Sequence, residues 1–282
     1  MNVSMHDSFN ISWKLNLAVR GLALPALLST YQDERRKIAE DLINFDFEHA
    51  SAFAAGDSKA LAVNFANNIA FISGIGAKYY PNVLNVPSAL AGGLQAGALL
   101  SPARVTRFID ANPLDIQLDI PMLGQFRIYF FTPNPNSSQE FLSDVSAHLT
   151  SSNSVLGRAS VIAAKSYSTL NTQPSETDEF VQPQRYNRIS KLFTPSIVTT
   201  AQKGQLEICS LPAMFRDSKW TFYLDNIMGC TTKWIGPVSE GECVILNVRP
   251  DGYVGCFKSF GTTQSLDASA WMDAYYGGFL KA

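Results

Sequence analysis

The first 75 residues place apolar side chains at the period of an α-helix, which predicts a helical N-terminal layer. Apolar residues recur at 11, 15, 18 and 22, and a second stripe runs through 9, 13 and 17. Two stripes on one helix indicate burial on more than one side. Gly21 and Pro25 predict the end of this first helix.

Two more helices follow in this layer. The second is expected from Ser29 or Thr30 to about residue 54, with Asp33 and Glu34 in its first turn, where the helix dipole favours acidic groups. The sequence Gly-Asp-Ser at 56–58 predicts a break, after which Ser58 caps a third helix that runs to residue 73.

Residues 74–125 lose this periodicity because glycine and proline interrupt them repeatedly, which predicts an ordered but irregular connection. A long irregular segment inside a compact chain usually carries function or wraps another surface. We therefore divide the chain into a helical segment (1–75), an irregular connecting strap (76–125) and a mixed domain (126–282).

The last part of the chain alternates strand and helix patterns. Strands are expected at 126–131, 196–200, 220–224, 243–248 and 253–257, with helices at 139–149 and from Ser265, as cap, to residue 276. Arg-Pro-Asp-Gly at 249–252 is the strongest hairpin signal, since it combines a preset φ with a glycine. Residues 171–188 have the composition of a solvated loop. This order predicts an α+β chain.

Composition narrows the possible functions. The 282 residues are 46% hydrophobic and 16% charged, which excludes a disordered chain, and a net charge of −2 provides no basic field for nucleic acid. The longest apolar run, 89–100, is too short for a membrane span and contains three glycines. His6, Asp7 and Lys14 make a secretory signal unexpected, so we expect a cytoplasmic protein without membrane or nucleic-acid partners.

The cysteines and histidines indicate neither redox nor metal chemistry. Cysteines at 209, 230, 243 and 256 form no Cys-x-x-Cys pair, and the three histidines are scattered. We expect small buried thiols in a reducing compartment and no metal ion.

Two ends of the chain resemble one family. Residues 1–15 contain Met-Asn, Asp-Ser-Phe-Asn and Trp-Lys-Leu in that order, and residues 28–36 contain Thr-Tyr-Gln-Asp-Glu-Arg-Arg. These stretches resemble the end of the flavin-binding motif of FAD-dependent aromatic hydroxylases, the phenol 2-monooxygenase group. Residues 248–255 and 266–280 resemble the hairpin and closing helix of that family's thioredoxin-like domain. The resemblance implies a thioredoxin-like α/β domain, here without redox cysteines.

The departures from the family affect the cofactor. The chain contains no Gly-x-Gly-x-x-Gly turn. By the resemblance, the family's Gly-Asp motif for the ribityl chain and its Pro-Gly loop for the flavin ring also have no counterpart here, since the match begins near the end of the flavin-binding motif. We therefore expect no bound cofactor, and a flavin hydroxylase is not the expected activity of this chain alone. By resemblance, Asn2, Asp7 and Asn10 are the positions inherited from the flavin site, with helix capping or interhelix hydrogen bonds as their alternative role.

The apolar residues of the helical layer need a cover. In the family these helices pack on the flavin domain, so here they pack on the rest of the chain, form a dimer or line a pocket. The family uses its thioredoxin-like domain for dimerisation, and we therefore expect a homodimer.

These observations lead to two functional hypotheses. The first is a cofactor-independent tailoring enzyme of secondary metabolism, which catalyses a cyclisation or isomerisation, including a pericyclic Diels–Alder type, by shaping an apolar substrate and polarising a carbonyl. The second is a non-catalytic dimerisation or assembly partner of a separate FAD-dependent monooxygenase.

For the first hypothesis we expect a pocket between the first helix and the strap. Each candidate donor also has a structural alternative: a polar first-turn residue for the histidine, a solvated surface group for the lysine and strap packing for the tyrosines. The candidate donors are His6, Lys14, Tyr79 and Tyr80, and the candidate substrate-binding residues are Met5, Phe9, Trp13 and Phe71.

Overall fold

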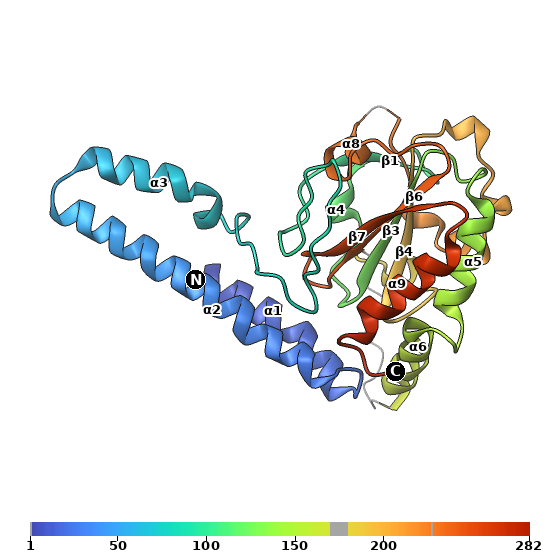
Figure 1. Cartoon of the computed structure of the whole chain (residues 1–282), viewed down its shortest axis with the longest axis horizontal. Coiled ribbons are helices and arrows are strands. Elements are labelled where there is room, and N and C mark those ends of the chain that lie inside the picture. The colour runs from blue at the N-terminus through green and yellow to red at the C-terminus, as the bar shows by residue number, and fades with distance from the viewer. Residues whose placement is uncertain (1, 170–179, 227) are drawn as a thin grey trace.

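The computed structural model describes residues 2–169, 180–226 and 228–282. Of the predicted loop at 171–188, residues 171–179 lie outside the described residues, and 180–188 contain a single 3-10 turn at Pro183–Arg185. Helix α1 (Asn2–Val19) lies beside α2 (Pro25–Ala54), and α3 (Ser58–Ile72) folds back along the far half of α2 (Figure 1). The second helix begins earlier than expected, at Pro25. Proline is tolerated in the first turn of a helix because the N–H group that it lacks would have no partner within the helix there.

The connection between the second and third helices is closed by an aspartate. Asp57 is the N-cap of α3, and its carboxylate accepts a hydrogen bond from the Ala60 backbone N–H at 2.9 Å. The predicted cap, Ser58, is instead the first residue of the helix. The two helices together, residues 25–72, form a hairpin whose outer part projects away from the sheet domain (Figure 1).

One seven-stranded mixed sheet forms the centre of the remaining chain. Its strand order is β2-β1-β5-β4-β3-β6-β7. The strands are β1 (Arg104–Arg107), β2 (Pro113–Asp115), β3 (Phe126–Thr132), β4 (Phe193–Thr199), β5 (Phe222–Leu224), β6 (Glu242–Val248) and β7 (Val254–Gly261).

Four of these strands have the connections of a thioredoxin-like fold. Strands β3 and β4 are parallel and are joined through α5 (Gln139–Thr150) and α6 (Val155–Thr169). Strand β6 is antiparallel to β3, β7 is antiparallel to β6, and α9 (Ser265–Gly277) follows. Ser265 begins this helix rather than capping it, and its hydroxyl donates to Asp144 Oδ2 at 2.8 Å. Helix α6 was not predicted from the sequence.

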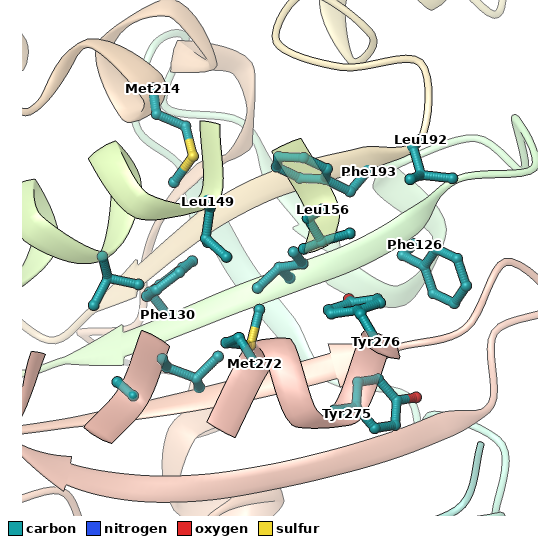
Figure 2. Packing of buried hydrophobic residues seen from close by; sticks show 14 of the residues in the cluster. Phe126, Phe130, Leu149, Leu156, Leu192, Phe193, Met214, Met272, Tyr275 and Tyr276 are labelled. Carbon is teal, nitrogen blue, oxygen red and sulfur yellow. The ribbon is translucent and has the colours of Figure 1, made fainter. Parts of the chain in front are cut away.

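Both faces of the sheet are buried, because successive side chains of a strand point to opposite faces. Phe126, Ile128 and Phe130 of β3 pack with α5, α6 and α9, as part of the apolar cluster seen from close by in Figure 2. Tyr129 and Phe131 of the same strand belong to the opposite cluster. That cluster includes strap residues, α4 (Ile116–Asp119) and α8 (Cys230–Trp234).

The helical layer packs into the apolar cluster that contains Phe126, Ile128 and Phe130. Trp13 and Leu17 of α1 are buried in it, and the Trp13 ring meets Phe126 edge-on with 5.8 Å between ring centroids. The turn between α1 and α2 also pairs with the C-terminal residues: the Leu24 N–H donates to the Phe279 carbonyl at 2.9 Å. The α1–α2 turn is therefore held against the C-terminal residues.

The strap is more regular than its sequence indicated, since β1, β2 and α4 fall within 76–125. Its first part runs along the open edge of β7, where Val86 N–H donates to the Gly255 carbonyl and Gly97 N–H to the Val254 carbonyl. This pairing covers a sheet edge that would otherwise be free to pair with another chain.

All four cysteines are free thiols; Cys230, Cys243 and Cys256 are buried as expected, whereas Cys209 is exposed. Burial raises the pKa of Cys243 far above its ordinary value, so this thiol stays protonated and unreactive. In the part of the chain that the structure describes, no helix is both long and apolar enough to span a bilayer.

A glycine in the strap tests its packing on α8. A Cβ at Gly92 would overlap the backbone carbonyl of Trp234, the group that accepts a hydrogen bond from Leu94 N–H at 3.0 Å. We expect Gly92→Ala to lower the free energy of unfolding by about 1–3 kcal/mol, measured by urea denaturation. Gly204→Ala is the matched control, because no described atom lies within 4 Å of the added methyl. Equal stability of the two variants would refute this packing.

Candidate functional site

A buried ion-pair network links the helical layer to the sheet domain. Its centre is Glu34 of α2, which is fully buried together with Lys14 of α1 and Arg249 of the β6–β7 turn. Arg249 binds the carboxylate with both terminal nitrogens, Nη1 to Oε1 at 2.6 Å and Nη2 to Oε2 at 3.0 Å. Lys14 Nζ lies 2.8 Å from Oε2. Such a planar two-point contact fixes orientation as well as distance.

A second carboxylate makes the network electrically balanced. Asp251 accepts hydrogen bonds from Arg249, Nε to Oδ1 at 3.0 Å and Nη2 to Oδ2 at 2.6 Å, and from Trp13 Nε1 at 3.0 Å. Two cations, Lys14 and Arg249, thus face two carboxylates. Because an unpaired buried charge is costly, this neutrality is what allows the cluster to be buried.

Asparagine side chains complete the coordination of Glu34. Asn10 donates to Oε2 at 2.8 Å, and Asn82 and Asn85 of the strap donate to Oε1 at 3.1 and 2.9 Å. The Glu34 carboxylate therefore accepts hydrogen bonds from α1, from the strap and from the β6–β7 turn at the same time. The sequence analysis placed Glu34 in a first turn. Because α2 begins at Pro25, it lies deeper in the helix and acts as an ion-pair partner.

The pKa values reflect this arrangement. Burial by itself raises the pKa of Glu34. Arg249, and then Lys14 and the Asn10 hydrogen bond, lower this pKa by more than burial raises it, so the net shift is downward. Burial lowers the pKa of Lys14 to about 8, against the opposing effect of Glu34. At neutral pH both groups therefore carry their charges.

A second, smaller set of contacts holds the start of α1. Arg35 pairs with Asp7, and its Nη1 donates to the Tyr79 hydroxyl at 3.1 Å. Asn10 Nδ2 also reaches that hydroxyl, at 3.4 Å. Asp7 and Asn10 thus make the interhelix bonds that were the alternative to an inherited flavin contact. The side chain of Asn2 lies outside those described.

An apolar groove opens beside this network, between α1 and the strap. Its volume is about 290 Å³, and it is lined by Met5, His6, Phe9, Asn10, Tyr79, Leu99, Met122, Asp251 and Tyr253. A hollow of about 220 Å³, which shares Phe9 and Met122, continues it along α1. A larger cavity of about 510 Å³ lies on the other side of α1, against α2 and the end of α3.

The structure brings some of the predicted site residues together and separates others. Four of them line the groove: Met5, His6, Phe9 and Tyr79. Trp13 lines the adjoining hollow, and Phe71 lines the larger cavity. Tyr80 is 68% exposed, and its ring lies 5.3 Å from Lys37 Nζ. Lys14 is neither solvated nor open to the groove, because its ammonium is held on Glu34. Their proposed roles remain predictions.

Glu34, Arg249 and Asp251 were not predicted to act together. The available signal was their residue type: an arginine and an aspartate next to a hairpin glycine, and a glutamate before two arginines. Nothing local shows that positions 215 residues apart bind each other, as Glu34 and Arg249 do.

The described cations beside the groove offer no site for the diphosphate of FAD. Besides the missing glycine turn, the cations nearest the groove, Lys14, Arg35 and Arg249, are each already paired with a carboxylate. A diphosphate needs free backbone N–H groups or unpaired cations. Among the described residues, no group of three His, Cys, Asp or Glu side chains could hold a metal ion.

The first test of the network removes the central charge. Glu34→Gln keeps the shape of the side chain but leaves Lys14 buried without a counter-ion. We expect a loss of about 3–5 kcal/mol in the free energy of unfolding, measured with urea. Arg36→Gln is the control, because Arg36 forms an exposed pair with Glu40 in the same helix, for which we expect less than about 1 kcal/mol. Similar losses in both variants would contradict a structural role for the network.

The second test uses pH. The folded-state pKa of Glu34 lies below its ordinary value of 4.5, so its stabilising contribution is complete above that pH and is lost as the pH falls. The gap in unfolding free energy between the parent chain and Glu34→Gln is expected to narrow from about pH 6 to pH 3. A gap that stays constant over this range would show that the Glu34 charge contributes nothing.

Relatives of this chain include two curated monooxygenases. The 3-hydroxybenzoate 4-monooxygenase of Comamonas testosteroni is 28% identical over 100% of this chain and 44% of its own length. A phenol 2-monooxygenase of Aspergillus fumigatus is 29% identical over 94% of this chain and 43% of its own length. This chain therefore spans less than half the length of these relatives.

Solved structures and family models agree with these relatives. The flavin-dependent monooxygenase PieE, solved with FAD and substrate, shares the fold with a TM-score of 0.53 at 18% identity, over 98% of this chain and 44% of PieE. Residues 1–46 match the FAD binding domain family. Residues 77–282 match the family described as phenol hydroxylase, C-terminal dimerisation domain. The chain thus belongs to the phenol hydroxylase family that this dimerisation domain defines.

Proposed function

We propose that this chain is a dimer-forming assembly part of an FAD-dependent aromatic monooxygenase, and that its α2–α3 hairpin receives a flavin-binding polypeptide. The observation that carries this proposal is the exposed apolar surface of the hairpin. Six large apolar side chains there are about half to three-quarters exposed: Ile43, Phe47, Phe53, Val63, Phe65 and Ile69.

The distribution of these side chains favours a partner that surrounds the hairpin. Val63 and Phe65 are two residues apart, so they lie about 200° apart around α3. A helix that is apolar on several sides is normally buried inside a larger structure. A single flat contact would therefore leave part of this surface in water.

The identity of the partner is inferred from the adjacent sequence. Helix α2 contains the end of the segment that matches the FAD binding domain family, at residue 46, and continues directly into the exposed part of the hairpin. A polypeptide that carries a flavin-binding domain would pack on α1 and α2, and the α2–α3 hairpin extends the same surface. Two copies of the chain would join through residues 77–282, the segment that matches the dimerisation domain.

A second candidate function is the cofactor-independent cyclisation or isomerisation of an apolar substrate, including the Diels–Alder type. The groove favours it, because His6 and the Tyr79 hydroxyl line an otherwise apolar surface. Tyr79 accepts hydrogen bonds from Arg35 and Asn10, so its own proton is directed by two fixed donors and could polarise a carbonyl. Trp13 and Phe71 would contribute shape outside the groove.

The assembly proposal is tested by co-expression. The partner is the part of the Comamonas testosteroni 3-hydroxybenzoate 4-monooxygenase that lies outside the aligned region. We expect this chain alone to be a flavin-free dimer by light scattering, and co-expression to give one complex that elutes with flavin absorbance. The Phe47→Ser, Phe53→Ser double variant should lose the complex but keep the dimer. It removes exposed apolar area from the α2–α3 hairpin, and burial of that area is what drives association with the partner.

The control for that experiment is Leu266→Ser, since Leu266 is 84% exposed on α9, away from the hairpin. It should leave the complex intact. Failure of the parent chain to form a complex, or a complex that tolerates the double variant, would refute the assembly proposal.

A further inference from the structure

Two residues that line the groove between α1 and the strap each carry a buried polar atom without a partner among the described residues. Asn10 Oδ1 and the Tyr253 hydroxyl are buried and make no hydrogen bond of normal geometry to any residue that the structure describes. Both residues line the groove, and they are 1% and 4% exposed. Buried polar groups are nearly always satisfied, so two such atoms at one cavity indicate that something else binds there.

The orientation of the Asn10 amide is fixed by its other contact. Its Nδ2 donates to the Glu34 carboxylate at 2.8 Å, and a carboxylate accepts but cannot donate. The amide oxygen is therefore the unpartnered atom, and only a hydrogen-bond donor can satisfy it. The ligand must bring an O–H or N–H group.

The Tyr253 hydroxyl adds a second requirement. Burial, and then the neighbouring Tyr79, raise the pKa of Tyr253, so the hydroxyl keeps its proton and can donate it. The Tyr253 ring stacks on Tyr79 with 4.5 Å between centroids, which holds the hydroxyl in place. A ligand hydroxyl can donate to Asn10 and accept from Tyr253 at once, whereas an amine cation or an ether cannot do both.

The remaining lining sets the charge and shape of the ligand. The one carboxylate of the lining, Asp251, is paired with Arg249, so it offers no free charge to a cationic ligand. The other walls are apolar or aromatic, among them Met5, Phe9 and Met122. Met5 and Phe9 are 59% and 46% exposed, and a methionine side chain adapts readily to a bound molecule.

We infer that this groove is a binding site for an uncharged, largely apolar alcohol, whose hydroxyl donates to Asn10 Oδ1 and accepts from the Tyr253 hydroxyl. Both polar atoms are closed off from solvent, so binding requires side chains of the groove lining to move aside. The site lies on α1, the strap and the β6–β7 turn. Phe47 and Phe53, whose substitution tests the assembly, lie on α2, so the two proposals can fail separately. The site would supply the substrate class for the second candidate function.

The test compares three naphthalene probes of similar size by isothermal titration calorimetry on the full chain. They are 2-naphthalenemethanol, its methyl ether and 2-methylnaphthalene. We expect the alcohol to bind about tenfold more tightly than either of the others, because only the alcohol satisfies the Asn10 oxygen. Equal affinity for the alcohol and its ether would overturn the proposal.

Three variants locate the site. Tyr253→Phe should reduce alcohol binding about fivefold without affecting 2-methylnaphthalene, and it should not lower the unfolding temperature, because the hydroxyl it removes has no partner in the described structure. Tyr80→Phe is the matched control, since Tyr80 is largely exposed and lines none of the cavities described above. Met122→Trp should fill the groove and abolish binding of all three probes. Unchanged alcohol binding in Tyr253→Phe or in Met122→Trp would place the ligand elsewhere and refute the assignment.

Discussion

The two-point ion pair between Glu34 and Arg249 is the contact on which the arrangement of this chain depends. It joins a helix near the N-terminus to a hairpin turn near the C-terminus, and both side chains are fully buried. Two charges gain little net stability when they leave water, because desolvation offsets most of their attraction. The benefit lies in geometry: every misaligned arrangement leaves a buried charge unpaired, so α2 has one permitted position against the sheet domain.

The groove follows from that constraint. Asn10 binds Glu34, and Asp251 binds Arg249, so two groove residues take their positions from the network rather than from apolar packing. Apolar packing alone would tolerate small shifts of α1, whereas the planar arginine–carboxylate contact does not. This rigidity allows Asn10 Oδ1 and the Tyr253 hydroxyl to remain unpaired beside an apolar surface, where a looser structure would rearrange to satisfy them.

The outer half of the helical layer obeys a different rule. Near the network, α1 and α2 are buried by the sheet domain, and Trp13 and Leu27 lie in its main core. Beyond Ile38, the last buried residue of α2, apolar side chains face water. The chain thus combines an anchored, charge-locked half with an uncovered apolar half. This contrast is why we assign recognition of a partner to the hairpin and recognition of a small molecule to the groove.

Much of the fold was predictable because it depends on local pattern. The helical period of residues 1–75, the apolar strand at 126–131 and the glycine of the hairpin turn each specify their element without distant contacts. Boundaries were less accurate where one residue has two roles: Pro25 could end one helix or begin the next, and only the paired turn at Leu24 decides this. The strap strands β1 and β2 are short and were missed, because their conformation comes from pairing with each other and with β5.

The site was predictable only in its apolar part. Met5, Phe9 and Tyr79 could be assigned to one surface, since they belong to the first helix and to the strap expected to pack on it. Lys14 was misplaced, because a lone lysine on a helix is usually solvated, and nothing within its own helix indicates a buried carboxylate from α2. The sequence by itself determined the elements, their apolar faces and the family resemblance. The tertiary structure decided which charges are paired, since ion pairing depends on distances between atoms that are far apart along the chain.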